Sequence, residues 1–179
     1  MNYGDIEVIS VGNGSSDYVG NFTKEENAII QNYLHGYVFH LFSGNSQIGN
    51  CRIDFDNSNA TLKSCVFEFL NSIKQEVKGV NTVILDPPYS KKFGLKYQKL
   101  IKNESKYKKA EQFLIFANAR KTTELFNLIR EKINPERIIM KSWNFYIPKG
   151  YYLRKGYCCY AGGYRKPTFL LILDKKMED

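Results

Sequence analysis

The stretch Thr82-Val83-Ile84-Leu85-Asp86-Pro87-Pro88-Tyr89 decides the fold of this chain. Its first four residues form an unbroken run of β-branched and apolar side chains, which is typical of a strand buried on both faces in a parallel sheet. The two prolines end such a strand, because each lacks a backbone N–H and has a fixed φ. The stretch therefore predicts a buried strand over 82–86 that ends in a rigid turn.

The turn that follows this strand has the groups needed to activate an exocyclic amino group. Such a nitrogen is a weak nucleophile, because its lone pair is delocalised into the base ring, and acceptors for its two N–H groups return that pair to nitrogen. The Asp86 carboxylate can accept one hydrogen and the carbonyl between the prolines the other, while Tyr89 offers a flat face for stacking. The plain alternative is an ordinary strand and proline turn. We favour the first interpretation, with these candidate catalytic residues: Asp86, Pro87, Pro88 and Tyr89.

Length and composition predict one soluble domain over 1–179. With 179 residues and 43% hydrophobic content, the chain can bury one core and has little left for a second. No apolar run approaches a membrane span, and the first residues lack a basic segment followed by an apolar one, so we expect a cytoplasmic protein without membrane contact. The cysteines have no metal-site spacing, so we expect them to be reduced and mostly structural, with no bound metal: Cys51, Cys65, Cys158 and Cys159.

The two halves of the chain differ in charge. Residues 1–90 hold 5 Lys and Arg against 10 Asp and Glu, a net charge of −5, whereas residues 91–179 hold 21 against 8, a net charge of +13. The basic excess begins directly after the Asp86–Tyr89 turn. We interpret it as the side from which a polyanionic substrate approaches, although a solvated lysine-rich surface is the alternative.

Strands alternate with helices along the chain. Thr23-Lys24-Glu25-Glu26 has capping-box spacing and predicts a helix over about 24–34 that ends at Gly36. The other expected strands are 37–42, 51–55, 60–66 and 137–143, followed by a hairpin of 156–160 with 168–173. A helix is expected at 67–77 and a partly helical stretch at 91–109. Residues 110–133 suit a helix or a helix pair, although 113–116 could instead be a strand. This order predicts an α/β fold with a mostly parallel sheet and a C-terminal antiparallel hairpin.

The loop Phe42-Ser43-Gly44-Asn45-Ser46-Gln47-Ile48-Gly49, followed by a strand with Asp54, resembles motif I and the next acidic position of class I S-adenosylmethionine-dependent methyltransferases. Glycines there let backbone N–H groups approach a ligand carboxylate, and the acid can accept ribose hydroxyl hydrogens. With Asp-Pro-Pro-Tyr about forty residues later, the chain looks like the amino-methyltransferases of adenine N6 or cytosine N4. The resemblance implies a Rossmann-like methyltransferase fold, S-adenosyl-L-methionine as cofactor, and these cofactor-binding residues: Gly12, Gly14, Ser15, Phe42, Ser43, Gly44, Ser46, Gly49, Asp54, Phe55 and Val66.

The chain departs from the family pattern at two places. The segment between the first two strands is too short for the usual helix, so we expect Asn45, Ser46 and the loop around 12–20 to hold the methionine end of the donor. Where relatives often place Asp at the end of the third strand, this chain has Ser64-Cys65, and we expect backbone atoms near Val66 to replace that side chain.

The substrate expected from these features is nucleic acid, DNA more than RNA. The basic segment 91–133 is the sizeable candidate for target recognition, and Lys91–Lys109 holds eight Lys and one Glu. A second basic cluster, within residues 151–166, contains five tyrosines. These tyrosines could stack on bases, and cross-strand packing explains them equally well. The candidate nucleic-acid-binding residues are Lys91, Lys92, Lys96, Lys99, Lys102, Lys106, Arg154, Lys155, Arg165 and Lys166.

Adenine N6 in DNA is the leading substrate, cytosine N4 stays open beside it, and so do three other functions. An RNA methyltransferase that modifies adenine N6 or guanine N2 of ribosomal or transfer RNA has a related tetrapeptide. A protein-glutamine methyltransferase usually begins this motif with Asn and has no use for the basic half. A nucleic-acid-binding module could keep the fold without turnover.

Overall fold

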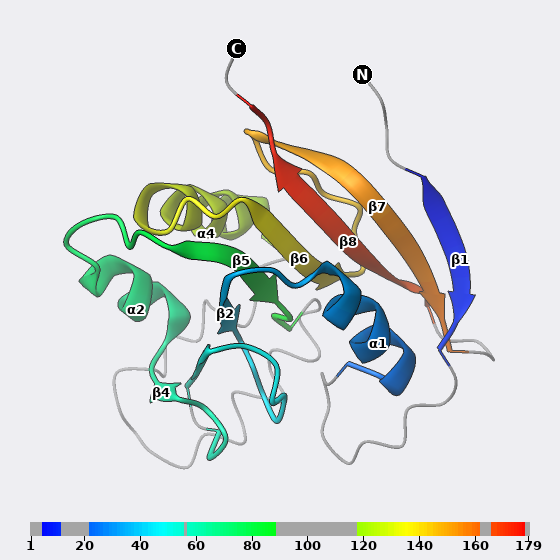
Figure 1. The fold of residues 1–179 in the computed structure, drawn as a ribbon, viewed down its shortest axis with the longest axis horizontal. Coiled ribbons are helices and arrows are strands. Elements are labelled where there is room, and N and C mark those ends of the chain that lie inside the picture. Colours follow the sequence, from blue (N-terminus) through cyan, green and yellow to red (C-terminus); the bar gives the residue numbers. More distant parts are fainter. Residues whose placement is uncertain (1–4, 12–21, 56, 89–117, 162–165, 178–179) are drawn as a thin grey trace.

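The computed structural model describes residues 5–11, 22–55, 57–88, 118–161 and 166–177, and Figure 1 shows how they are arranged. The strands of this part of the chain are β1 (Ile6–Ser10), β2 (Tyr37–Leu41), β3 (Cys51–Asp54), β4 (Leu62–Lys63), β5 (Val80–Leu85), β6 (Arg137–Ser142), β7 (Tyr151–Tyr160) and β8 (Thr168–Lys175). Its helices are α1 (Lys24–Tyr33), α2 (Val66–Ser72) and α4 (Ala119–Lys132).

These strands form one mixed sheet in the order β1-β7-β8-β6-β5-β2-β3-β4. β8 lies antiparallel between β6 and β7, and every other pairing of neighbours is parallel. The expected α/β class is therefore confirmed at this level, with its mostly parallel sheet and C-terminal antiparallel hairpin.

The sheet is covered by helices on both faces, and successive strand residues point to opposite faces. On the α4 face, Val83, Leu85 and Met140 pack in one core with residues of α2 and α4. On the α1 face, Ile84 and Ile139 pack in a second core with Ile30 of α1. Figure 1 shows α1 and α4 on opposite sides of the sheet. After Ile84 and Ile139, the next residues on the α1 face are Asp86 and Lys141. This change from apolar to charged side chains marks the candidate site.

The capping box that the sequence predicts at the start of α1 is confirmed. The Glu26 N–H donates to Thr23 Oγ1 (3.2 Å), and the Thr23 N–H donates to Glu26 Oε2 (2.8 Å). These bonds satisfy two groups that a helix start would otherwise leave unpaired, so α1 begins at Lys24. The helix ends at Tyr33, one residue before the predicted limit.

Several boundaries differ from the sequence-based prediction. The strand expected at 60–66 is reduced to Leu62–Lys63, and Val66 instead begins α2. α2 ends at Ser72 rather than near 77, because the chain turns toward α4, where the Val77 N–H donates to the carbonyl of Lys132 (2.9 Å). The first hairpin strand begins at Tyr151 rather than at 156, since an irregularity between Leu153 and Lys155 breaks the alternation of buried and exposed residues.

β1 is a strand that the sequence analysis missed. It pairs in parallel with β7 at the edge of the sheet, from Ile6 opposite Gly156 to Ser10 opposite Tyr160. Four of its five residues are exposed, including Val8 at 75%, so it lacks the buried face that a strand pattern normally reveals. The stretch expected to be partly helical at 91–109 and the alternative strand at 113–116 lie outside the described residues.

Candidate functional site

The candidate site lies where the chain order of the sheet reverses. β2 and β5 are neighbours, and the chain proceeds from β2 to β3 and β4 on one side and from β5 to β6 on the other. Ligands of open α/β sheets bind outside the carboxyl ends of the strands at such a switch point. The residues at these two ends are Phe42 and Ser43 after β2, and Asp86 after β5.

The segment between β2 and β3 has no helix, as its length predicted. Residues 42–50 instead return along β2, where the Asn50 N–H donates to the carbonyl of Val38 (2.9 Å). A Cβ atom at Gly49 would lie 3.2 Å from the Cβ of His40, so the returning segment lies close to the strand. Phe42, Gly44 and Gly49 have φ values of 63°, 50° and 106°, a conformation that glycine adopts without strain and phenylalanine rarely adopts.

Asp54 ties this loop to the end of β3. Its Oδ2 accepts a hydrogen bond from the Gly44 N–H (3.0 Å), and its own backbone carbonyl accepts one from the Ser64 N–H (3.0 Å). The structure therefore brings Asp54 and Gly44, two predicted cofactor-binding residues, into direct contact. Phe55 is half-buried beside them, and Val66 is buried at the start of α2. Gly12, Gly14 and Ser15, which were predicted to bind the cofactor as well, lie outside the described residues.

Asp86 is buried at the end of β5, with 9% of its surface exposed. Its Oδ1 has no hydrogen-bond partner among the described residues. Pro87 is buried and Pro88 is half-buried, whereas Tyr89 lies outside the described residues. Because a buried carboxyl oxygen without a partner is costly, an oxygen of this kind is the expected acceptor for a bound ligand.

Other buried polar atoms without partners lie on α1, on β2 and directly after β2, which is the strand next to β5. Within the described part of the chain they are Glu26 Oε1, His40 Nε2 and Ser43 Oγ. Ser43 follows β2, His40 belongs to β2 and faces α1, and Glu26 belongs to the first turn of α1. Native proteins leave few such atoms unpaired, so their concentration at the switch point indicates a site for a polar ligand.

A buried ion pair joins α1 to the carboxyl end of β6. Lys141 Nζ lies 2.7 Å from Glu26 Oε2, with both side chains almost wholly buried. Lys141 Nζ also lies 5.5 Å from the centre of the Phe22 ring, and that ring packs against His40 with 5.8 Å between ring centres. Neither Glu26 nor Lys141 was identified as a functional residue from sequence. Their signal was a charged residue at a position where the local pattern predicts burial.

The pKa values of this cluster favour neutral Asp86 and neutral His40. Burial raises the pKa of Asp86 to about 8, with the positive charge of Lys141 opposing this shift and the negative charge of Glu26 adding to it. Burial lowers the pKa of His40 to about 4, against a hydrogen bond of Nδ1 with the carbonyl of Ile48. Although burial alone lowers the pKa of Lys141, the charges of Asp86 and Glu26 raise it above its ordinary value.

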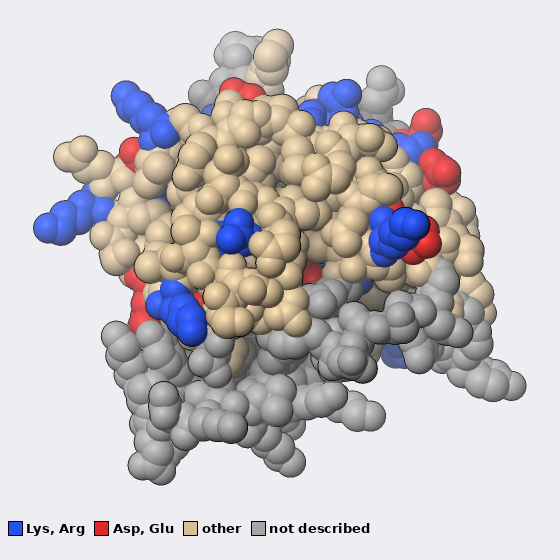
Figure 2. Space-filling view, turned by 60° about the horizontal axis from the view of Figure 1, so that its bottom comes forward, with Lys and Arg blue, Asp and Glu red and all other residues tan. Residues whose placement is uncertain are grey.

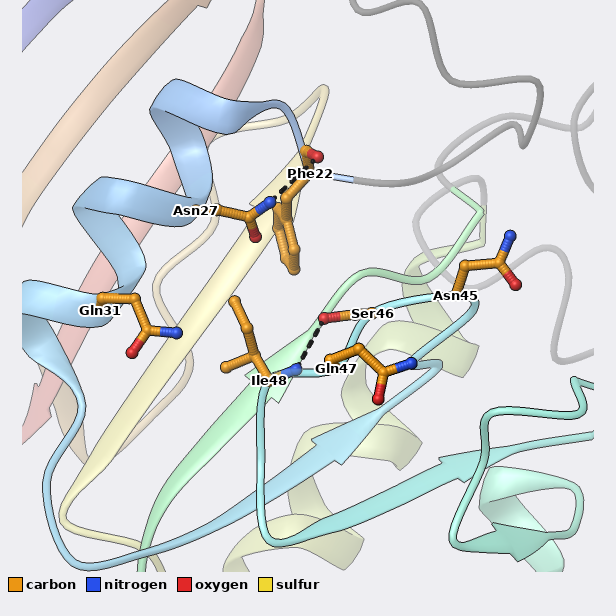
Figure 3. A pocket seen from close by; sticks show the side chains of 7 residues that line it. All are labelled: Phe22, Asn27, Gln31, Asn45, Ser46, Gln47 and Ile48. Atoms are coloured by element: carbon orange, nitrogen blue, oxygen red, sulfur yellow. Dashed lines mark hydrogen bonds between the residues drawn. The ribbon is translucent and has the colours of Figure 1, made fainter.

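A pocket of about 350 Å³ opens beside this cluster, between α1 and the loop that follows β2. Figure 3 shows Asn27 and Gln31 extending from α1, Asn45, Ser46 and Gln47 on the loop, and the Phe22 ring and Ile48 between them. Most of these side chains are neutral amides or a hydroxyl, which can both donate and accept hydrogen bonds. Asn45 and Ser46 are the residues predicted to hold the methionine end of the donor, and the amides of α1 were missed.

The predicted nucleic-acid-binding residues fall into two groups. Those of the basic segment and Arg165 lie outside the described residues: Lys91, Lys92, Lys96, Lys99, Lys102, Lys106 and Arg165. Arg154 Nη1 lies 3.0 Å from Asp174 Oδ2, and Lys155 Nζ lies 3.5 Å from Glu7 Oε2, so both charges are partly neutralised within the protein. Lys166 is exposed. On the face drawn in Figure 2, the Lys and Arg side chains of the described residues are scattered rather than gathered in one patch.

The predictions about metal binding, cysteines and membrane contact can be compared with the described residues only. No three His, Cys, Asp or Glu side chains among them gather in a geometry that could hold a metal ion. Among the described residues, Cys51, Cys65, Cys158 and Cys159 form no disulfide bond. None of the helices described here combines the length and the apolar character that crossing a membrane requires.

Comparison of the chain with protein-family models, with curated proteins and with solved structures finds no match.

Proposed function

We propose that this protein transfers a methyl group from S-adenosylmethionine to an exocyclic amino group of a nucleic-acid base, with adenine N6 in DNA as the leading substrate. The observation that carries the proposal is the position of Asp86. It begins the Asp-Pro-Pro-Tyr turn, lies at the switch point of the sheet, and has a buried oxygen without a partner among the described residues. An amino group placed there finds the acceptor that its chemistry requires.

The residues after β2 fit the methyl donor. The buried Ser43 hydroxyl is without a partner among the described residues and can bond to the donor, whereas the Gly44 N–H already donates to Asp54. The amide-lined pocket of about 350 Å³ beside this loop has the polar groups that the amino-acid end of the donor needs. The Asp54 carboxylate at the end of β3 suits the ribose hydroxyls, as it does in nucleotide-binding α/β sheets.

The chain's own residues then perform three tasks in the reaction. Asp86 accepts one hydrogen of the target amino group, and the carbonyl of Pro87 accepts the other, which returns the lone pair to nitrogen. Asp86 also takes the proton that the nitrogen loses once it has formed the new bond to carbon. The donor, when bound, supplies the methyl group on a positively charged sulfur, which keeps the electron pair of the broken bond.

The test is transfer of radiolabelled methyl from S-adenosylmethionine to unmodified duplex DNA and, in parallel, to structured RNA. The Asp86→Asn variant keeps the shape of the side chain but removes the acceptor charge, so we expect label in DNA to fall by about 10²- to 10⁴-fold. Glu136→Gln is the matched control, because this exposed carboxylate precedes β6 at the opposite end of the sheet. Digestion of the product then identifies the base.

The other outcomes separate the rival functions. Label in RNA alone would replace DNA by RNA as the substrate class. Donor binding by calorimetry without label in either nucleic acid would favour a binding module. If neither donor binding nor methyl transfer is detected, the proposed function is wrong.

A further inference from the structure

Three elements bring charged side chains together on the α1 face of the sheet. Leu85 of β5 pairs with Met140 of β6, so Asp86 and Lys141, one residue further along each strand, are neighbours on that face. Glu26 comes from α1, one helical turn before Ile30, which packs in the core of the same face. Residues far apart in sequence therefore form one buried cluster of two carboxyl groups and one ammonium group, which we call the Glu26–Lys141–Asp86 cluster.

The contacts in this cluster differ for its two carboxyl groups. Glu26 Oε2 accepts from Lys141 Nζ at 2.7 Å and from the Thr23 N–H at 2.8 Å. Asp86 Oδ1 accepts no hydrogen bond from any described residue, although Asp86 is buried as well. Two buried carboxylates are not both neutralised by one ammonium, and burial of the excess negative charge is unfavourable. Glu26 Oε1 and Asp86 Oδ1 both lack a partner among the described residues, but Glu26 Oε2 accepts from Lys141 and Thr23, so the proton that removes this charge belongs on Asp86.

We propose that Glu26 and Lys141 are positioning residues that together set the charge of Asp86, so that the resting protein holds a proton on the Asp86 carboxyl. Lys141 favours the carboxylate form and Glu26 opposes it. The direction of the Asp86 shift agrees with this arrangement, since burial raises the pKa of Asp86 to about 8.

The neighbouring titratable groups do not compete for this proton. Among the described residues that share the α1 face with the cluster they include His40 on β2 and Cys159 on β7, and the tyrosines of this face, Tyr33 and Tyr157, hydrogen-bond to each other. Burial lowers the pKa of His40 to about 4 and raises the pKa of Cys159 to about 12. His40 and Cys159 are both neutral between about pH 5 and 9, so among the described residues the charges that act on Asp86 in this range are those of Glu26 and Lys141.

The consequence for catalysis rests on the function proposed above. When the amino nitrogen bonds to the methyl carbon, the bond from sulfur to that carbon breaks with its electron pair left on sulfur, and the nitrogen releases one proton. Only the carboxylate form of Asp86 can take that proton. The rate of methyl transfer should therefore rise with pH through the titration of Asp86.

The test titrates Asp86 directly in the full chain without donor, by carbon-13 NMR of protein labelled at the aspartate carboxyl carbons, with the signal assigned through Asp86→Asn. We expect a midpoint near pH 8 in the wild type. Lys141→Met should raise the midpoint and Glu26→Gln should lower it, each by about one pH unit or more, because each removes one nearby charge. Lys141→Arg, which keeps the positive charge, should move the midpoint less than Lys141→Met.

Midpoint shifts of opposite sign in Lys141→Met and Glu26→Gln distinguish this role from a structural one. If the two residues were only structural, both variants would loosen the site, and both midpoints would move toward the ordinary pKa of an exposed aspartate. A wild-type midpoint near pH 4, or shifts of the same sign in the two variants, would overturn the proposal. If Lys141→Met does not fold, an unchanged or raised midpoint in Glu26→Gln still contradicts the proposal. If the midpoints move as expected but no methyl transfer occurs between pH 6 and 9, the proposed function fails and this inference stands.

Discussion

Asp86 and His40 give folding stability a pH dependence that can be worked out residue by residue. The unfolded chain releases the Asp86 proton near pH 4, whereas the folded chain keeps it until its pKa of about 8, so its contribution to stability falls as pH rises between these values. Unfolded His40 gains a proton below about pH 6.5, but the pKa of about 4 keeps folded His40 neutral, so its contribution rises with pH over that range. The two effects oppose each other below about pH 6.5, and of these two the Asp86 effect remains between pH 6.5 and 8.

We therefore expect the free energy of unfolding to fall between pH 6.5 and 8, with a slope of up to about 1.4 kcal/mol per pH unit. Urea denaturation at several pH values measures this slope. Asp86→Asn, which cannot titrate, should remove it, and His40→Gln should leave it in place. A slope that survives in Asp86→Asn would assign the effect to another group.

The residues of the site were predictable where their signal is local. Asp86 was identified because the prolines after it and the apolar run before it are contiguous with it in sequence. Lys141 and Glu26 were not, since 115 positions separate these contact partners and neither has an unusual neighbour. Each carried a weaker sign: Glu26 belongs to a capping box, and Lys141 interrupts an apolar strand. Neither sign predicts that the two side chains meet.

The turn from α1 into β2 connects the two elements that carry Glu26 and His40. Gly36 has a φ of 60° there, and a Cβ atom at this position would lie 1.9 Å from Asn81 Oδ1. That oxygen accepts a hydrogen bond from the Tyr37 N–H (3.1 Å), so it is not free to move away without losing the bond. The turn therefore depends on glycine both for its backbone conformation and for space.

We expect Gly36→Ala to reduce the free energy of unfolding more than Gly150→Ala does. Gly150 has a φ of 88°, but a Cβ there would meet nothing within 4 Å, so its variant measures backbone strain alone, about 1 kcal/mol. Gly36→Ala adds the collision with Asn81 and should cost about 1–3 kcal/mol more. Chemical denaturation of both variants provides the comparison, and equal losses would show that Asn81 moves aside freely.

Elements with local signals were likewise the ones that sequence predicted well. α1 has a capping box, and β5 is an apolar run before prolines, so both begin and end within two residues of the expected positions. β1 escaped detection because its partner β7 lies about 150 positions away and its side chains are mostly exposed. The early end of α2 depends on a contact of Val77 with the end of α4, which propensity does not encode.

At the scale of the whole molecule, the order of strands explains why distant motifs share one site. The alternation of strands and helices predicted a mostly parallel sheet, but not that β2 and β5 would be its adjacent switch-point strands. This adjacency brings the loop at 42–49 and the turn at Asp86 to the same edge. The charge distribution of the chain adds a direction of approach, because residues 89–117 alone carry eight Lys and two Glu and thus +6 of the net charge of +8.

If this basic segment contacts a nucleic-acid backbone, affinity for duplex DNA should fall steeply with salt, since each neutralised phosphate releases counterions. The triple variant Lys99→Ala, Lys102→Ala, Lys106→Ala should then reduce the slope of log affinity against log salt by up to about 3.

The matched control is the triple variant Lys24→Ala, Lys74→Ala, Lys78→Ala, which changes the net charge equally within the acidic half. Fluorescence anisotropy between 50 and 200 mM salt measures both slopes. Equal slopes would mean that total charge alone attracts DNA, whereas a loss confined to the first variant would place the phosphate contacts in the segment that directly follows the Asp-Pro-Pro-Tyr turn. Because Arg154 and Lys155 already pair with Asp174 and Glu7, their neutralisation should change the slope less than the loss of those three lysines.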